Sequence, residues 1–244
     1  MGREKLFCEY AKTKAASGQG TSPEPEAALE SEKKHISRRQ LKEALLERYT
    51  PEMYEKISGG SAAIAGLGGL GSQIAVMLTR AGVGKLFLVD FDRIELTNLN
   101  RQAYDLTHLG REKTEALTEI LKKINPYLEV TAVREKVTAE NAGRLFQGYP
   151  ILCEAFDKPG QKAMLVNAVL EQCPHTVVIS GNGMAGCSSA NTIVTQRKMK
   201  RLYLCGDGET DLASGVCLMP SRVMVCAAHQ ANMAIRLMLG ETSG

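Results

Sequence analysis

The chain has 244 residues, of which 44% are hydrophobic and 23% are charged, and its formal net charge is +3. This composition is typical of one globular domain and does not indicate a nucleic-acid partner, because the basic residues are not gathered into one run. No apolar stretch reaches the roughly 18 residues that a membrane span needs, so we expect no membrane segment. Seven scattered cysteines without a C-x-x-C pair favour a reduced, cytoplasmic protein.

The N-terminal quarter divides into two segments. Residues 1–34 are rich in Lys, Glu, Ser, Gly and Pro and have little to bury, which predicts a mostly disordered tail. Residues 35–60 form a helical entry segment, with one amphipathic helix that Pro51 interrupts and a second short helix over 52–57. The apolar face of the first helix consists of Ile36, Leu41, Leu45 and Leu46.

The remaining domain, residues 61–244, alternates apolar runs with helical patterns. Strands are predicted at 61–66, 85–90, 128–133, 150–156 and 176–181. Helices are predicted at 70–81, at 113–124, from Thr138 onward and at 163–173. This alternation predicts a Rossmann-like, doubly wound α/β fold with a mostly parallel sheet that is covered on both faces.

The alternation of apolar runs with helical patterns ends after Gly183. Short strands are predicted at 191–195 and 201–206, followed by a polar loop over Gly206–Gly215 that we expect to be mobile. A long helix with an apolar face is predicted over residues 222–239.

A glycine-rich turn follows the first predicted strand. Gly66, Gly68 and Gly71 form G-x-G-x-x-G at the start of a helix, and Gly69 is an additional glycine inside it. Such a turn lets the backbone and the helix N-terminus approach a phosphate, although glycines can also serve only to pack a helix on a strand. Asp90 ends the second strand at the usual distance for a carboxylate that binds ribose hydroxyls. These residues fit any nucleotide that contains a ribose.

The residues after Asp90 narrow the choice. The pieces "GLGGLGS", "AGVGKLFLVDFD", "TNLNRQ", "REKTEAL…INP" and "CEAFDKPGQKAMLVN" together resemble the ThiF/MoeB/HesA family of E1-like adenylyltransferases over roughly residues 61–172. The tail "LYLCGD…MPSRVMVCAAHQANMAIRLMLG" is similar to the short ThiF-type branch of thiamine biosynthesis. The resemblance implies a homodimer that uses ATP to adenylate the C-terminal Gly-Gly carboxylate of a ubiquitin-fold, ThiS-like sulfur carrier protein and releases pyrophosphate.

The resemblance also implies roles for single residues. Asp90 would accept hydrogen bonds from the ATP ribose, while Asn98 and Arg101 would face the phosphates. Gln102 would help to fix that segment. An alternative for Asn98 is a plain turn residue, because Asn is common in turns.

Two further residues complete the implied site. Lys113 would bind a phosphate as a compact charge, and Asp157 would carry the Mg²⁺ that bridges phosphate oxygens, so that Arg101, Lys113 and Asp157 form the catalytic set. Lys113 could instead be a solvated charge on a helix face, and Asp157 could instead cap the following helix. Asp92 and Glu95 are interpreted as surface carboxylates.

Three departures from the wider family concern cysteine and arginine. Many relatives hold zinc with two C-x-x-C pairs, but this chain has none, so we do not expect zinc. Cys187, Cys205 and Cys217 are candidates for a covalent role, although burial would explain them equally well. Arg48 resembles an arginine that relatives lend to the partner subunit's phosphate site.

Two other functions remain open from the sequence. An NAD-dependent oxidoreductase could use the same glycine turn, but "NLNRQ" has no role in that chemistry. A non-catalytic E1-like binding scaffold is the second alternative. The presence of Asp90, Arg101, Lys113 and Asp157 together argues against it.

Overall fold

A computed structural model describes residues 36–210 and 217–243 of the chain. The tail expected over residues 1–34 therefore lies outside the described residues, as do residues 211–215 of the expected loop. The domain described below spans Arg38–Gly244.

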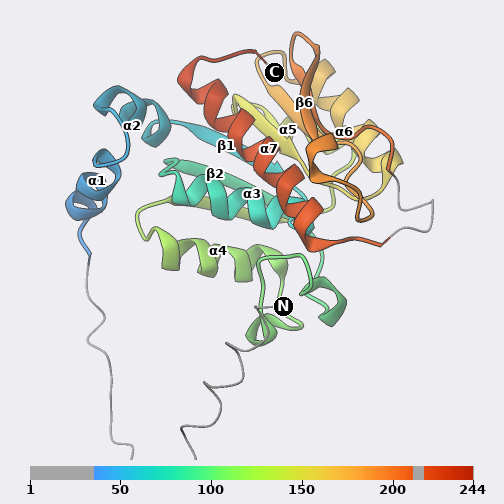
Figure 1. Cartoon of the computed structure of the whole chain (residues 1–244), viewed down its shortest axis with the longest axis horizontal. Coiled ribbons are helices and arrows are strands. Elements are labelled where there is room, and N and C mark those ends of the chain that lie inside the picture. The colour runs from blue at the N-terminus through green and yellow to red at the C-terminus, as the bar shows by residue number, and fades with distance from the viewer. Residues whose placement is uncertain (1–35, 211–216, 244) are drawn as a thin grey trace, which may run out of the picture. The chain divides into compact units, whose positions relative to one another are not determined.

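Within the described residues, seven strands form one sheet. They are β1 (Ser61–Ala65), β2 (Lys85–Asp90), β3 (Glu129–Arg134), β4 (Ile151–Glu154), β5 (Val177–Gly181), β6 (Val194–Met199) and β7 (Leu202–Gly206). Their spatial order is β3-β2-β1-β4-β5-β7-β6, and every neighbouring pair is parallel except β6 with β7 (Figure 1). The predicted doubly wound, mostly parallel sheet is confirmed.

The strand order reverses direction between β1 and β4. From β1 the chain moves outward to β2 and β3, and it then crosses back to place β4 on the other side of β1. In open parallel sheets a crevice forms outside the carboxyl ends of the strands at this point. The residues that leave these two ends are Gly66 and Ala155, and the Ala155 amide donates to the Ala65 carbonyl at 2.9 Å.

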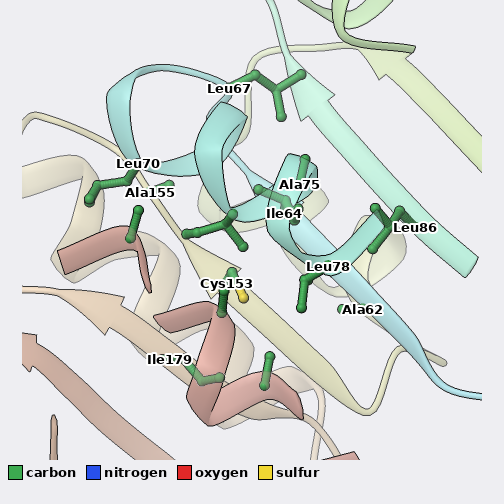
Figure 2. Close-up of a cluster of buried hydrophobic side chains, with 14 of the residues drawn as sticks. Ala62, Ile64, Leu67, Leu70, Ala75, Leu78, Leu86, Cys153, Ala155 and Ile179 are labelled. Atoms are coloured by element: carbon green, nitrogen blue, oxygen red, sulfur yellow. The ribbon is translucent and has the colours of Figure 1, made fainter. Parts of the chain in front are cut away.

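Helices cover both faces of the sheet. The α3 (Gly69–Arg80), α4 (Lys113–Ile124) and α7 (Pro220–Leu239) helices contribute to one buried apolar cluster, while α5 (Ala139–Phe146) and α6 (Pro159–Gln172) contribute to a second (Figure 1). Figure 2 shows part of the first cluster, in which side chains of β1, β2 and β4 lie against those of α3. The drawn strand residues include Ile64, Leu86 and Cys153.

Two helices precede the sheet. The α1 helix (Arg38–Leu46) contains no buried residue, whereas α2 (Pro51–Ser58) begins with a proline and is capped by the Thr50 hydroxyl, which accepts from the Met53 amide at 3.2 Å. The apolar face expected on the first helix is therefore only partly covered by the described residues. Leu45 on this face packs against the turn after α3, because its Cδ1 atom lies 2.8 Å from where a Cβ would stand on Gly82.

The strand predicted over residues 191–195 is wrong at its start. Residues Ala190–Thr192 form a short 3₁₀ helix, and β6 begins only at Val194. The reason is local hydrogen bonding by Ser189, whose hydroxyl accepts from the Asn191 amide at 3.3 Å and whose carbonyl accepts from the Thr192 hydroxyl at 2.8 Å. Such side-chain bonds compete with strand pairing.

No helix within residues 36–210 and 217–243 combines the length and apolar character that crossing a bilayer requires.

Candidate functional site

The glycine turn links β1 to α3 and requires glycine at two positions. Gly66 has a φ of 88°, and its amide donates to the Val89 carbonyl at 2.9 Å. A Cβ on Gly71 would lie 1.8 Å from the Gly66 carbonyl oxygen, which is far inside any permitted contact. The turn can therefore close only without side chains at these positions, and it leaves the amides at the start of α3 available for an anion.

Asp90 is buried at the end of β2 and is tied to the glycine turn. One carboxylate oxygen accepts from the Leu67 amide at 2.6 Å, and the other accepts from the Asp92 amide at 2.8 Å. Because each carboxylate oxygen can accept more than one hydrogen bond, Asp90 keeps capacity for a ligand hydroxyl. The sequence did not indicate this second role, in which Asp90 holds the turn in place.

The segment around Arg101 folds back onto the same turn. The side-chain stem of Arg101 lies against Gly69, where an added Cβ would be 3.2 Å from Cγ. The Ser72 hydroxyl accepts from the Ala103 amide at 3.1 Å, and the Gln73 side-chain amide donates to the Arg101 carbonyl at 3.4 Å. The first turn of α3 thus holds this segment through side chains that the sequence analysis did not select.

Asn98 and Gln102 lie on this segment with different surroundings. Asn98 ends the short 3₁₀ helix Leu96–Asn98, and its side-chain oxygen accepts from the Glu95 amide at 3.1 Å, so the turn role is present. Gln102 is buried, and its side-chain oxygen has no hydrogen-bond partner among the described residues. Buried polar atoms are rarely left unpaired, so this oxygen is an open acceptor beside the glycine turn.

Lys113 is the first residue of α4 and is buried, in contrast to Lys122 and Lys123 later in the helix. The interpretation of Lys113 as a solvated helix-face charge is therefore wrong. Its ammonium lies 2.9 Å from a carboxylate oxygen of Asp92. Asp92 is exposed, as expected of a surface carboxylate, and it also pairs with Lys113.

Tyr104 joins Lys113 to the glycine turn. Its hydroxyl donates to the Leu67 carbonyl at 2.9 Å and lies 3.4 Å from the Lys113 carbonyl oxygen. Burial, with the nearby Asp90 carboxylate as a second cause, raises the pKa of Tyr104 well above its usual value, so the hydroxyl remains a donor. A tyrosine two residues after Gln102 carries no motif signal, and sequence reasoning missed it.

Asp157 follows the carboxyl end of β4 and is exposed to solvent. The capping interpretation is wrong, because Lys158 occupies the N-cap position of α6 and makes no side-chain capping bond. Asp157 has neither a hydrogen bond nor an ion pair with a described residue. The turn it belongs to abuts the glycine turn, since a Cβ on Gly66 would lie 2.9 Å from both the Ala155 carbonyl oxygen and the Phe156 ring.

The candidate cysteines differ in their surroundings. Cys205 is buried, which raises the pKa of its thiol to about 11, so the reactive thiolate is disfavoured at neutral pH. Cys187 and Cys217 are exposed, and the irregular segments that carry them are joined by a bond from the Gly186 amide to the Cys217 carbonyl at 2.7 Å. Across the described parts of the chain, no group of three or more His, Cys, Asp or Glu side chains is arranged to hold a metal ion.

The fold and these contacts define an α/β protein whose glycine turn, helix N-terminus, acidic strand end and buried lysine are gathered at the switch point of the sheet, the arrangement typical of nucleotide-binding proteins. The chain belongs to the ThiF family, whose model matches residues 38–244.

Curated relatives have several printed functions. The tRNA threonylcarbamoyladenosine dehydratase of Haemophilus influenzae is 33% identical over 137 residues, which are 55% of this chain and 52% of that protein. The adenylyltransferase and sulfurtransferase uba4 of Aspergillus niger is 33% identical over 56% of this chain and 27% of its own length. Ubiquitin-like modifier-activating enzyme 5 of Xenopus laevis is 42% identical over 36% of this chain and 22% of its own length. The chain therefore spans about half or less of the length of these relatives.

Solved structures share the fold. The E. coli tRNA N6-threonylcarbamoyladenosine dehydratase TcdA in complex with ATP superposes with a TM-score of 0.75 at 22% identity, over 83% of this chain and 95% of that chain. E. coli MccB superposes with a TM-score of 0.63 at 20% identity, over 79% of this chain and 60% of that one.

Proposed function

We propose that the chain binds ATP and adenylates the C-terminal Gly-Gly carboxylate of a ubiquitin-fold, ThiS-like sulfur carrier protein, as a step of thiamine biosynthesis. The E1-like motifs and the relatives named as adenylyltransferase or modifier-activating enzyme support the reaction class. The similarity of the β7–α7 region to the short ThiF-type branch supports the choice of carrier.

The observation that carries the proposal is the packing of the Arg101 segment on the glycine turn. A dehydrogenase needs the turn and Asp90 but has no use for an arginine held there. Here the Arg101 stem contacts Gly69, and the Arg101 guanidinium is oriented by the Thr97 carbonyl at 3.2 Å and the Asn100 side-chain oxygen at 2.9 Å. A fixed guanidinium beside a phosphate-binding turn serves a reaction in which phosphate charge changes.

The reaction needs alignment more than proton transfer. A carboxylate oxygen of the carrier attacks the α-phosphorus of ATP, the bond from that phosphorus to the bridging oxygen breaks, and pyrophosphate leaves. Because the nucleophile is already an anion, no general base is required. Asp90 and the glycine turn hold the nucleotide, while Arg101 and Lys113 reduce the phosphate charge that repels the incoming carboxylate.

A divalent cation fits this arrangement. Mg²⁺ in nucleotide sites is usually held by one or two carboxylates together with phosphate oxygens and water, so one exposed carboxylate is sufficient protein ligation. Asp157 is such a carboxylate, and its turn abuts the glycine turn. Bound there, Mg²⁺ would neutralise charge on the phosphates that depart as pyrophosphate.

Exchange of labelled pyrophosphate into ATP tests the proposal. We expect exchange only when the chain, MgATP and a ThiS-like carrier are all present, and none with the same carrier lacking its last glycine. Calorimetric titration with NAD tests the oxidoreductase alternative in parallel. A tRNA arm is included because one relative is named for tRNA threonylcarbamoyladenosine. Exchange that depends on tRNA and not on the carrier would contradict the choice of substrate.

The proposal includes a cytoplasmic homodimer. The partly covered apolar face of α1 and the exposed Arg48 that follows this helix support a role for the entry segment in self-association. Light scattering of the full chain, compared with a Leu41→Glu variant, tests the dimer. Equal monomeric masses for the two proteins would contradict it.

A further inference from the structure

A buried acid and a half-buried base lie on either side of Asp157 in the chain. Glu154 ends β4 and is fully buried, and Lys162 lies in the first turns of α6 with 18% of its side chain exposed. The Lys162 ammonium lies 2.8 Å from one Glu154 carboxylate oxygen and 3.1 Å from the other. Neither residue belongs to the site inferred from the sequence.

Both side chains converge on the backbone of Phe156. The Glu154 carboxylate accepts from the Phe156 amide at 2.7 Å, and the Lys162 ammonium donates to the Phe156 carbonyl at 2.9 Å. The residue directly before Asp157 is therefore held on its donor side by one member of the ion pair and on its acceptor side by the other.

Among the described residues, main-chain bonds hold the rest of this turn. The Ala155 amide donates to the Ala65 carbonyl on one side, and the Lys158 carbonyl accepts from the Gln161 and Lys162 amides at 3.0 Å on the other. The N-cap Lys158 contributes no side-chain capping bond. The ion pair thus fixes the main chain as far as Phe156. The next side chain is the exposed carboxylate of Asp157.

A gain in folding stability alone does not explain why the ion pair of Glu154 and Lys162 is present. Buried ion pairs often add little compared with apolar side chains of similar size, although loss of one partner is costly. The Glu154 carboxylate is further satisfied by the Ser180 hydroxyl at 2.5 Å, so the cluster is complete in its hydrogen bonds. A complete polar cluster whose bonds meet at one peptide group specifies the geometry of that group.

We propose that Glu154 and Lys162 are positioning residues, which fix the turn at Phe156 and thereby set where the Asp157 carboxylate lies relative to the glycine turn. This inference rests on the proposed function, because Asp157 matters there as the ligand of the nucleotide's cation. A displacement of about 1 Å in a reacting arrangement can cost on the order of 10²-fold in rate.

The test compares full-length Lys162→Met and Lys162→Arg with Ser180→Ala as the matched control. Ser180→Ala removes a bond to the same carboxylate but touches neither polar group of Phe156. Four quantities are measured: hydrogen exchange of the Phe156 amide by NMR without ligand, MgATP affinity, the rate of carrier-dependent pyrophosphate release, and the Mg²⁺ concentration for half-maximal rate. Glu154→Gln replaces Lys162→Met if the latter does not fold.

We expect Lys162→Met to speed exchange at Phe156 by about tenfold or more, to slow pyrophosphate release by roughly 10- to 100-fold and to raise the Mg²⁺ requirement. MgATP affinity should stay within about threefold, Lys162→Arg should recover most of the rate, and Ser180→Ala should resemble wild type. Unchanged exchange at Phe156 in Lys162→Met, or an equal loss of rate in Ser180→Ala, would overturn the inference. A wild-type chain without carrier-dependent pyrophosphate release would instead refute the proposed function, and the exchange data would still decide the positioning role.

Discussion

The two acids of the candidate site, Asp90 and Asp157, have opposite surroundings. Asp90 is buried, and both of its oxygens accept backbone amides that belong to the glycine turn and to the segment after β2. Asp157 is exposed and has no partner among the described residues, although the residue before it is held on both sides. On one side of the candidate site, which we call the closed side, the protein's own bonds occupy the carboxylate. On the other, the open side, a carboxylate without a described partner follows a residue whose backbone is held in place.

This contrast predicts that different residues control nucleotide binding and the rate of adenylation. Groups that hold the nucleotide gain from being preorganised, because less freedom is lost when the ligand arrives. A carboxylate that must take a divalent cation together with the phosphates gains from having no competing partner. The closed side is therefore expected to control stability and affinity, and the open side is expected to control rate.

The largest expected effect is on the open side. Asp157→Asn keeps the size of the side chain but removes the charge that holds a divalent cation, so pyrophosphate release at saturating ATP and Mg²⁺ should fall by about 10²–10³-fold. ATP affinity should change little, because Asp90 and the glycine turn are untouched. Activity within about threefold of wild type would mean that Asp157 does not bind the cation.

A pair of glycine variants tests the closed side. Gly71→Ala places a Cβ 1.8 Å from the Gly66 carbonyl oxygen and should cost about 1–3 kcal/mol of unfolding free energy or more, with loss of ATP binding. Gly160→Ala, in the first turn of α6, meets no atom within 4 Å and should leave stability within about 1 kcal/mol, in the stabilising direction. Urea unfolding measures both, and similar midpoints for the two variants would contradict the contrast.

Asp90→Ala should mainly weaken binding. It removes hydrogen bonds of a charged acceptor worth about 1.5–3 kcal/mol, which corresponds to a rise in the ATP dissociation constant of about 10- to 150-fold. It also leaves the buried Leu67 amide unpaired, so some stability is lost with affinity. Calorimetry with MgATP and with NAD checks this, and tight NAD binding without MgATP binding would contradict the nucleotide assignment.

The smallest expected effect concerns the cysteines. Burial raises the pKa of the Cys205 thiol to about 11 and that of Cys226 to about 12, so both stay protonated and unreactive near pH 8. Iodoacetamide at pH 8 should therefore modify the exposed Cys187 and Cys217 first, as read by mass spectrometry. If neither Cys187 nor Cys217 acts covalently, the modified protein should adenylate as fast as the unmodified protein. A loss of activity in proportion to the modification of one of these cysteines would assign that cysteine a role.

The same raised pKa values predict a stability trend at alkaline pH. A thiol whose pKa is higher in the folded state than in the unfolded state contributes to the free energy of unfolding. This contribution is fully present at pH values below the pKa of the unfolded state, which is near 9. This contribution is lost as the pH rises from about 9 toward 11, because only the unfolded chain then gains from ionisation. The urea midpoint should accordingly fall over that window.

The order of strands and helices was predictable because local patterns decide it. Apolar runs that alternate with helical patterns predict a parallel sheet, and G-x-G-x-x-G before Asp90 identifies the binding end of the first two strands. The short 3₁₀ helix at Ala190–Thr192 was missed, because the choice there depends on bonds of one serine that periodicity does not record.

Side-chain partners were not predictable, because they depend on contacts between distant parts of the chain. The bond from Leu67 to Asp90 spans 23 residues, and the contact of Tyr104 with Leu67 spans 37. The ion pair of Glu154 and Lys162 is indicated in the sequence only by a charged residue inside the apolar run "PILCEAF". A carboxylate in such a strand must find a partner, but the sequence does not say which one.

The antiparallel strand β6 has a consequence for how the protein behaves at high concentration. It forms the outer edge of the sheet beyond β7, and its register shifts between Arg197 and Met199. An edge strand that is irregular and carries basic side chains is a poor template for a strand of another molecule, because hydrogen bonds cannot continue in step along it. The irregularity thus protects this edge of the sheet from pairing with strands of other molecules while the chain folds.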